Sequence, residues 1–280
     1  MAIDSFPLEG RRALVSGSTQ GIGRAIALRL AAEGATLSLL ARDAARLDAT
    51  VADAVRAGAH PGHFSRSCDV RDRAAVDAAA AAAVARHGPL YAAVANAGVG
   101  GPNAAGPGDR FEELVATNLT GTYNVFRAAE RHLAPRPEAG SGAGSSAGSG
   151  AVFGARHLVA IASILARIGV AGYSGYCASK AGITGLVRAL AMELAPAEVQ
   201  VNAICPGWVD TAMAREGVAG FAAALGVPYE DAYRRAMQDV PLGRMSAPED
   251  IAGVVAWLLS PDARGVTGQA LDVNGGAFML

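Results

Sequence analysis

The chain alternates short apolar or β-branched runs with segments of helical periodicity over nearly its whole length. Strands separated by single helices are typical of βαβ units, whose parallel strands need a crossover between them. Such strands are buried on both faces and their crossovers are right-handed. The pattern therefore predicts an α/β fold, a doubly wound and mostly seven-stranded parallel sheet with helices on both faces. The expected strands are residues 12–17, 35–41, 63–69, 90–96, 156–163, 199–205 and 269–273, and a long helix is expected over 112–133.

The alternation continues on both sides of one unusual segment, so residues 1–280 are interpreted as a single domain. Residues 139–151 read AGSGAGSSAGSGA. A segment of this composition cannot bury enough apolar surface to offset the conformational entropy that it would lose on becoming ordered. The composition therefore predicts a flexible Gly/Ser-rich surface loop. A functional lid is the alternative for this insert.

Composition excludes several classes of partner. The 24 Lys and Arg residues balance 25 Asp and Glu residues, for a formal net charge of −1, so neither nucleic acid nor a membrane is expected. The three cysteines, Cys68, Cys177 and Cys205, form no CxxC motif and cannot all pair. We therefore expect a reducing, cytoplasmic location. The five histidines are scattered along the sequence, and no metal site is expected.

A glycine-rich turn, Gly17-x-x-x-Gly21-x-Gly23, follows the first expected strand and opens a helix. Glycines in such a turn let the backbone approach a pyrophosphate, whose charge is favoured at the helix N-terminus. A glycine cluster also occurs in ordinary tight turns between a strand and a helix. The position of this one favours dinucleotide binding.

Tyr176 and Lys180 lie four residues apart in a helical segment, which places them on one face. Lys180 is the only lysine among the 24 basic residues. Its retention indicates a need for a compact ammonium, although a lone lysine on a solvated face is the alternative. A phenol with a pKa of about 10 needs a shift of about 3 units to act near neutrality. A cation about 4 Å away supplies that shift, so Lys180 is expected to make Tyr176 a general acid/base.

Together these motifs resemble the short-chain dehydrogenase/reductase (SDR) family, in its compact single-domain branch with a Rossmann-type sheet. The resemblance covers nearly the whole chain. One departure is Ala95, where the family often has an asparagine, and the Gly/Ser insert is another. The further matching motifs are Asp69-Val70, Asn96-Ala97-Gly98, Asn118 in TNLTGTYNV, Ser163, Pro206-Gly207 and VTGQALDVNGG near the C-terminus.

The resemblance implies a catalytic set of Asn118, Ser163, Tyr176 and Lys180. Tyr176 would exchange a proton with the substrate oxygen, and Ser163 would hydrogen-bond that oxygen. Lys180 would lower the pKa of Tyr176 and bind the nicotinamide ribose, and Asn118 would bend its helix around a proton-relaying water. Hydride would move between the nicotinamide and the substrate carbon.

A nicotinamide dinucleotide is the cofactor that the resemblance implies. Asn96 and Gly98 would line the adenine ribose, and Asp69 would contact the adenine. Pro206, Gly207 and Thr211 would hold the carboxamide. The remaining candidate contacts are Gly17, Ser18, Gln20, Gly21, Ile22, Gly23, Val70, Tyr176, Lys180 and Val209.

The end of the second strand bears on the choice of nicotinamide. NAD-preferring relatives usually have an acid where Ala41 stands, whereas here Arg42 follows and can pair with a 2′-phosphate. Ser18 could assist. Asp43 is a competing candidate for the ribose, but it precedes a helix and is better interpreted as its N-cap. NADP(H) is therefore favoured over NAD(H).

The expected substrate is a hydrophobic ketone or secondary alcohol. Residues from about 212 to 238 are expected to form a helical substrate lid, and apolar residues there would either line the pocket or pack the core. The C-terminal part of the sequence resembles 3-oxoacyl-thioester reductases. An acyl carrier protein would require a basic patch, for which the candidates are Arg127, Arg131, Arg167, Arg234 and Arg235.

Two other functions stay open. One is an NAD-dependent secondary alcohol dehydrogenase, and the other is a non-enzymatic nucleotide-sensing protein on the same fold. By resemblance, the chain is also expected to form a homotetramer or homodimer through the helices that carry Asn118 and Tyr176 and through the C-terminal strand.

Overall fold

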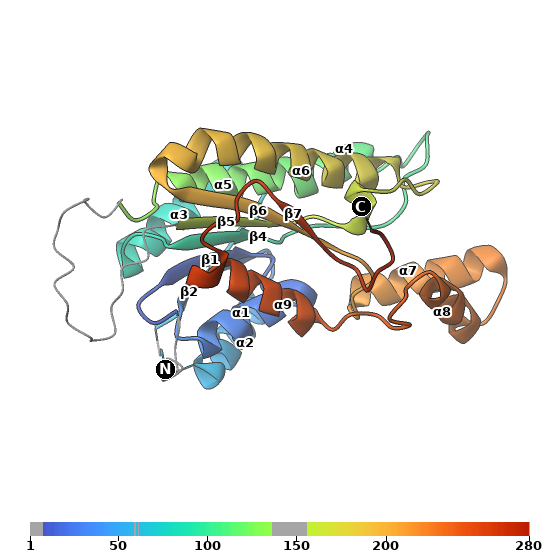
Figure 1. The fold of residues 1–280 in the computed structure, drawn as a ribbon, viewed down its shortest axis with the longest axis horizontal. Coiled ribbons are helices and arrows are strands. Elements are labelled where there is room, and N and C mark those ends of the chain that lie inside the picture. Colours follow the sequence, from blue (N-terminus) through green and yellow to red (C-terminus); the bar gives the residue numbers. More distant parts are fainter. Residues whose placement is uncertain (1–7, 59, 61, 136–155, 280) are drawn as a thin grey trace.

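The fold is described from a computed structural model, which covers residues 8–58, 60, 62–135 and 156–279 (Figure 1). The expected Gly/Ser-rich loop at 139–151 lies outside these described residues.

Within the described residues, seven parallel strands form one sheet in the order β3-β2-β1-β4-β5-β6-β7. This order confirms the predicted doubly wound sheet. Every expected strand is present, although most are shorter than predicted. The strands are β1 Arg12–Ser16, β2 Thr36–Ala41, β3 Phe64–Ser67, β4 Ala92–Ala95, β5 Arg156–Ile161, β6 Val199–Pro206 and β7 Ala270–Val273.

Helices cover both faces of the sheet and create two apolar cores (Figure 1). One face carries α1 (Gly21–Ala32), α2 (Ala44–Ala57) and α9 (Pro248–Leu258). The other carries α3 (Arg73–His87), α4 (Phe111–Val115), α5 (Gly121–Glu130) and α6 (Ser174–Leu194). Because both faces are covered, most residues of the central strands are apolar and buried, and all eight residues of β6 are buried, including the polar Gln200 and Asn202.

Side chains at the strand ends start several of these helices. The Asp43 carboxylate accepts a hydrogen bond from the Arg46 backbone N–H at 3.0 Å, which caps α2 as predicted. Asp72 caps α3 in the same way, through the Ala75 N–H at 3.0 Å.

The predicted helix over 112–133 is not one regular α-helix. A π-helical turn at Ala116–Thr120 separates α4 from α5, and Asn118 lies within it. A π turn inserts one extra residue into the helix, and such turns occur frequently at functional sites.

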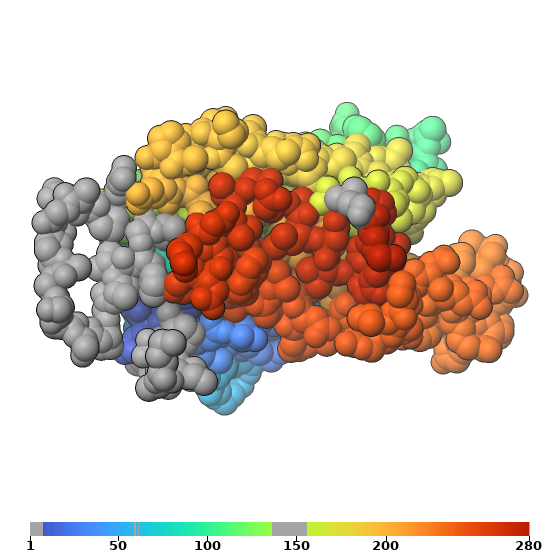
Figure 2. Space-filling view, viewed as in Figure 1, coloured from blue at the N-terminus to red at the C-terminus, as the bar shows by residue number. Residues whose placement is uncertain are grey.

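The helices α7 (Ala212–Leu225) and α8 (Tyr229–Gln238) project from the body of the molecule (Figures 1 and 2). They have a small apolar cluster of their own, made by Val218, Ala222, Ala232, Met237, Val240 and Met245. The predicted helical character of residues 212–238 is therefore confirmed, and their function as a lid stays a prediction.

Short 3-10 helices occupy Ile164–Ala166, Ala195–Ala197 and Pro261–Ala263. None of the helices in the described ranges combines the length and the apolar character needed to cross a membrane.

A buried polar pair links the sheet to the end of α9. The Tyr91 hydroxyl donates to the Leu259 carbonyl at 2.9 Å and lies 3.0 Å from Nε2 of His157. Because that hydroxyl donates its only proton to Leu259, we assign the His157 proton to Nε2. Burial lowers the pKa of His157 to about 3, with Arg11 and Arg156 contributing in the same direction.

This low pKa predicts a specific acid sensitivity. The folded-state pKa lies below the ordinary value of 6.5, so stability is complete above pH 6.5 and is lost as the pH falls toward 3. The slope due to this group approaches about 1.4 kcal/mol per pH unit. Urea unfolding between pH 7 and pH 4 should therefore show a flatter pH dependence for His157→Gln than for the wild type, by about that slope. Parallel curves for the two proteins would contradict the assignment.

Candidate active site

The glycine-rich turn packs directly against the end of β4. Gly17 has φ +65°, and a Cβ atom there would lie 2.6 Å from the Ala97 Cα. A Cβ on Gly23 would lie 2.0 Å from the Gly17 carbonyl oxygen. Both positions therefore require glycine, and the start of α1 is held close to the ends of β1 and β4.

Asn96 and Ser16 hold the ends of these two strands together. The Asn96 side chain donates to the Gly17 carbonyl at 2.9 Å and to the Ser16 carbonyl at 3.3 Å. The Ser16 hydroxyl accepts from the backbone N–H groups of Asn96 and Ala97 at 3.2 and 3.3 Å. Sequence reasoning missed Ser16, for which the only signal was a polar residue at the end of an apolar strand.

The buried side chain of Asn118 uses its polar atoms within the protein. Its Oδ1 accepts from the Val99 N–H at 2.8 Å, and its Nδ2 donates to the Val99 carbonyl and to the Ser179 hydroxyl, both at 3.0 Å. A Cβ on Gly98 would lie 3.1 Å from Oδ1 of Asn118 and 3.5 Å from Nζ of Lys180. The π turn thus brings Asn118 to the segment after β4 and to α6, and Ser179 is a partner that the sequence did not indicate.

Lys180 reaches the end of β5 from the first part of α6. It is only 5% exposed, and its Nζ donates to the Ile161 carbonyl at 2.9 Å. The same Nζ lies 5.7 Å from the ring centroid of Tyr176. Among the described residues, only one of the three ammonium N–H groups has a hydrogen-bond partner, so two remain for a ligand.

Burial governs the ionisation of the tyrosine and the lysine. Although Tyr176 as a residue is only half-buried, burial of its hydroxyl raises its pKa above the ordinary value of 10.0, and a hydrogen bond with Ser163 opposes this rise. Burial also lowers the pKa of Lys180 to about 8. The expectation that Lys180 brings the Tyr176 pKa toward neutrality is not met in the protein alone, because loss of hydration raises that pKa and Ser163, not Lys180, is the group that lowers it.

Ser163 lies directly beyond β5 and has two roles. Its hydroxyl accepts from the Leu165 N–H at 3.1 Å and caps the 3-10 turn, as its position at a strand end would predict. It also lies close enough to the Tyr176 hydroxyl to lower the pKa of that group. The structure therefore brings Ser163, Tyr176 and Lys180 together at the carboxyl end of the sheet, with Asn118 beside them.

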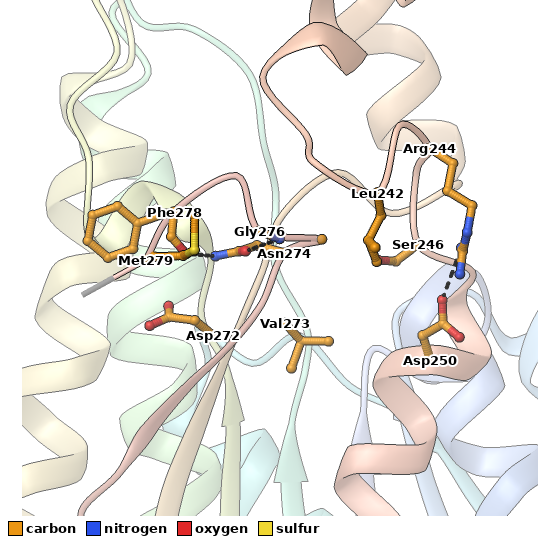
Figure 3. Close-up of a pocket in the computed structure, with 11 residues that line it drawn as sticks. Leu242, Arg244, Ser246, Asp250, Asp272, Val273, Asn274, Gly276, Phe278 and Met279 are labelled. Atoms are coloured by element: carbon orange, nitrogen blue, oxygen red, sulfur yellow. Dashed lines mark hydrogen bonds and ion pairs between the residues drawn. The ribbon is translucent and has the colours of Figure 1, made fainter.

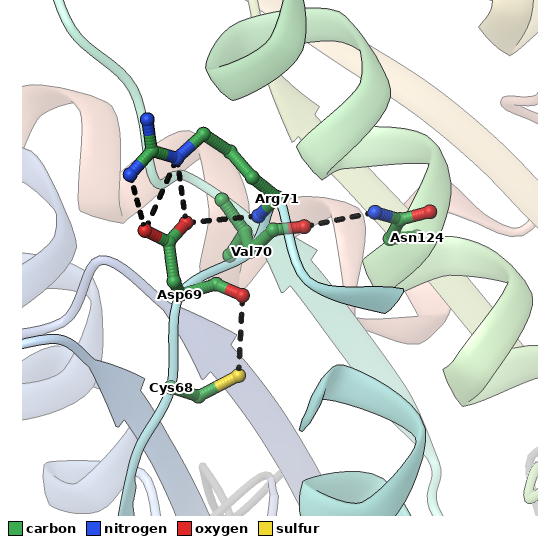
Figure 4. A network of polar contacts seen from close by, with 5 residues as sticks. All are labelled: Cys68, Asp69, Val70, Arg71 and Asn124. Atoms are coloured by element: carbon green, nitrogen blue, oxygen red, sulfur yellow. Dashed lines mark hydrogen bonds and ion pairs between the residues drawn. The ribbon is translucent and has the colours of Figure 1, made fainter. Parts of the chain in front are cut away.

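Asp69 carries an ion pair that the sequence did not indicate (Figure 4). Its carboxylate accepts from Nε of Arg71 at 3.0 and 3.1 Å and from Nη2 at 2.7 Å. Arg71 holds the pKa of Asp69 below its ordinary value. The neighbouring Val70 carbonyl accepts from Nδ2 of Asn124 at 2.9 Å, which fixes this segment to α5.

The segment after β6 closes the other side of the glycine turn. Gly207 packs closely against Asn274, because a Cβ atom on Gly207 would lie 2.9 Å from the Asn274 Cα. The Gly207 N–H donates to the Val273 carbonyl at 3.1 Å. The Thr211 hydroxyl caps α7 by accepting a hydrogen bond from the Ala214 N–H at 3.3 Å. A Cβ atom added to Gly21 would lie 3.0 Å from the Thr211 Cγ2, so this residue packs against the glycine turn. The other predicted contacts here are Pro206, at the end of β6, and Val209, which is buried.

The remaining predicted contacts lie on the β2 side of the turn. Ser18 is buried, Ile22 packs against the first apolar core, and Gln20 is exposed. Arg42 is exposed, and its guanidinium has neither a hydrogen bond nor an ion pair with another described residue.

These residues fit a dinucleotide. The glycine turn gives access to the backbone at the N-terminus of α1, Arg42 offers an exposed cation, and Lys180 has spare N–H groups. In the part of the chain that the structure describes, no three His, Cys, Asp or Glu side chains gather as a metal site.

A separate hollow of about 550 Å³ lies between the β7 tail and the segment before α9 (Figure 3). Leu242, Val273, Phe278 and Met279 are among its lining residues. Its lining does not include the catalytic candidates, so we do not assign the substrate to it.

The chain is similar to known reductases. A family model described as Enoyl-(Acyl carrier protein) reductase matches residues 17–277. The chain is 38% identical over 266 residues to a Streptomyces coelicolor protein named "Putative ketoacyl reductase", covering 94% of this chain and 95% of the relative. It is 33% identical over 275 residues to the 3-oxoacyl-[acyl-carrier-protein] reductase MabA of Mycobacterium tuberculosis, covering 98% of this chain and 95% of that relative.

Solved structures agree with these relatives. A tryptophan variant of actinorhodin polyketide ketoreductase, solved with NADPH, superposes with a TM-score of 0.83 at 35% identity and covers 99% of both chains. The match extends over the sheet, the glycine turn and the segment that carries Tyr176 and Lys180. The chain therefore belongs to the short-chain dehydrogenase/reductase family and is an oxidoreductase that interconverts alcohol and carbonyl groups with a nicotinamide cofactor.

Proposed function

We propose that this protein is an NADP(H)-dependent ketoreductase that acts on a hydrophobic ketone, with 3-oxoacyl thioesters as the leading substrate class. The observation that carries the proposal is the meeting of Ser163, Tyr176 and the buried Lys180 beside the glycine turn. The similarity to ketoacyl reductases supports the same substrate class.

In this mechanism Tyr176 is the proton donor. Its raised pKa keeps the hydroxyl protonated at neutral pH, so it can give its proton to a carbonyl oxygen during reduction. The Ser163 hydroxyl, next to Tyr176, is positioned to hydrogen-bond the same oxygen. Lys180, with a pKa of about 8, is mostly charged at pH 7 and stabilises the phenolate that forms. When bound, the nicotinamide supplies the hydride.

Alcohol oxidation needs a deprotonated Tyr176 at the start, and the raised pKa opposes this form. Asn118 acts as a positioning residue in this scheme because it joins the Val99 backbone to Ser179, next to Lys180. A proton relay through a water at Asn118 remains part of the proposal.

The apolar surface of α7 and α8 supports a hydrophobic substrate. Met213, Phe221, Leu225 and Tyr229 are each between 38% and 45% exposed, so they do not simply fill the core. Met213 also packs against the segment after β4, because a Cβ atom added to Gly100 would lie 2.8 Å from the Met213 Sδ. These contacts support a lid function for residues 212–238.

The arginines considered for carrier-protein docking are mostly engaged in ion pairs. The pairs are Arg127 with Glu130 and Glu193, Arg131 with Asp77, Arg167 with Asp272, and Arg234 with Asp231. Of the five candidates, only Arg235 has no ion pair within the described residues, which leaves little of the expected basic patch. We therefore propose a small-molecule ketone or acyl thioester as substrate, without a carrier protein as a requirement.

The proposed assembly, by resemblance to the family, is a homotetramer or homodimer.

The first prediction from this proposed function concerns proton donation. Tyr176→Phe should lower kcat for ketone reduction by a factor of about 10² to 10⁴, because the hydroxyl is lost, and should leave cofactor affinity nearly unchanged. The assay is the initial rate at 340 nm with NADPH and NADH in parallel. The substrate panel contains an acetoacetyl thioester and aryl, cyclic and steroid ketones.

Turnover of simple ketones without any turnover of the thioester would remove the 3-oxoacyl assignment. Cofactor binding without turnover of any ketone would favour secondary alcohol oxidation or the nucleotide-sensing alternative.

The second prediction concerns the energetic cost of Lys180. Its folded-state pKa of about 8 lies below the ordinary 10.5, so the unfolded state binds more protons between these values and stability rises with pH there. Lys180→Met should abolish activity yet increase the free energy of unfolding at pH 7 by about 2 kcal/mol, after allowing about 1 kcal/mol for the lost hydrogen bond. Without cofactor, the gain should shrink between pH 8 and 10.5. A destabilised variant at pH 7 would contradict this prediction.

The third prediction concerns the cofactor. Arg42→Ala should raise KM for NADPH about tenfold, because a charge-assisted contact to the 2′-phosphate is lost, and should leave KM for NADH nearly unchanged. Steady-state kinetics with each cofactor measures both values. Equal kcat/KM for the two cofactors in the wild type, or a preference for NADH, would reject NADP(H) and favour the NAD-dependent alternative.

A further inference from the structure

Arg46, in the first turn of α2, reaches across to the glycine turn. Its Nη1 donates to Oε1 of Gln20 at 2.8 Å. Gln20 directly precedes Gly21 at the N-cap of α1, and its side chain makes no capping hydrogen bond. The contact with Arg46 therefore does not compete with a helix cap.

The contact places the Arg46 guanidinium at the glycine turn, on the side of the β2 end that Arg42 follows. β1 and β2 are neighbouring parallel strands, with Ser16 paired to Leu40, so their carboxyl ends lie together. Gln20 follows the first strand and Arg42 the second, and α1 and α2 pack side by side (Figure 1). Arg46 lies one helical turn beyond Arg42 and bridges the two strand ends.

Asp43 orients Arg46 without using all its donors. Its carboxylate lies 3.3 Å from Nε of Arg46 and also accepts the Arg46 backbone N–H. With Nε facing Asp43 and one Nη1 hydrogen facing Gln20, three of the five guanidinium donors have no partner among the described residues. The Arg46 side chain is 62% exposed, so a ligand can reach these donors.

A phosphate monoester carries a charge of about −1.5 to −2 at pH 7 and has three strong acceptor oxygens. Arg42 alone leaves much of that charge unbalanced, and guanidinium groups bind phosphate through paired hydrogen bonds. We propose that Arg46, held by Gln20 and Asp43, is a second specificity-determining cation for the 2′-phosphate of NADP(H). The proposal rests on the cofactor preference proposed above.

The test measures binding without turnover. Isothermal titration calorimetry compares adenosine 2′,5′-bisphosphate with AMP, which lacks the 2′-phosphate. Arg46→Gln should weaken binding of the bisphosphate about tenfold and change AMP binding less than twofold. Gln20→Ala should weaken bisphosphate binding about threefold, because Arg46 loses its orientation.

Arg56→Gln is the matched control. It makes the same charge change on the same helix, ten residues and about 15 Å further along the axis, beyond the screening length at physiological salt. It should leave both affinities unchanged. In steady-state kinetics, Arg46→Gln should raise the KM for NADPH about tenfold without changing kcat. The KM for NADH should stay the same.

The outcomes separate the two proposals. If the wild type binds bisphosphate and AMP equally, the NADP(H) preference fails and this inference fails with it. If Arg42→Ala weakens bisphosphate binding but Arg46→Gln behaves like Arg56→Gln, the preference stands and the role of Arg46 is overturned. If Arg46→Gln acts as expected but Gln20→Ala has no effect, positioning by Gln20 is overturned.

Discussion

Burial of both faces of the parallel sheet is the constraint on which the rest of this structure depends. Polar side chains cannot be hydrated within such a sheet, so those buried in the strands, such as Gln200 and Asn202, are hydrogen-bonded, and the polar residues of the site lie where the strands end. Ser16, Asn96 and Ser163 all lie at carboxyl ends and hydrogen-bond to neighbouring strand ends or turns. The N-terminus of α1 faces the same edge, and the candidate active site lies there as a consequence.

Within that edge, burial of the Lys180 charge costs stability. Its ammonium is buried against the Ile161 carbonyl, and its lowered pKa reports the cost of removing it from water. The π turn around Asn118 and its contacts with Val99 and Ser179 hold the neighbouring backbone in place. Stability and activity are therefore opposed here, as expected where a fold holds a charge for chemistry.

The region proposed to bind substrate is built differently from the rest. α7 and α8 pack around their own small apolar cluster, apart from the two cores that cover the sheet. The side chains that these helices expose can change without disturbing the strands that hold Ser163 or the glycine turn. Under the proposed lid function, substrate specificity would lie in this peripheral helical pair rather than in the sheet.

The sequence by itself determined the alternation of strands and helices, the glycine turn and the Tyr176–Lys180 face, because these depend on local periodicity and on residue types at short spacing. The break in the predicted 112–133 helix was not evident, since a π turn depends on the contacts that Asn118 makes 19 residues away at Val99. Only the tertiary structure decided the Arg46 contact with Gln20 and the direction of the Tyr176 pKa shift. The Arg46 contact results from packing between two elements distant in sequence, and the pKa shift results from loss of water around the hydroxyl. Neither cause leaves a periodic signal in the sequence.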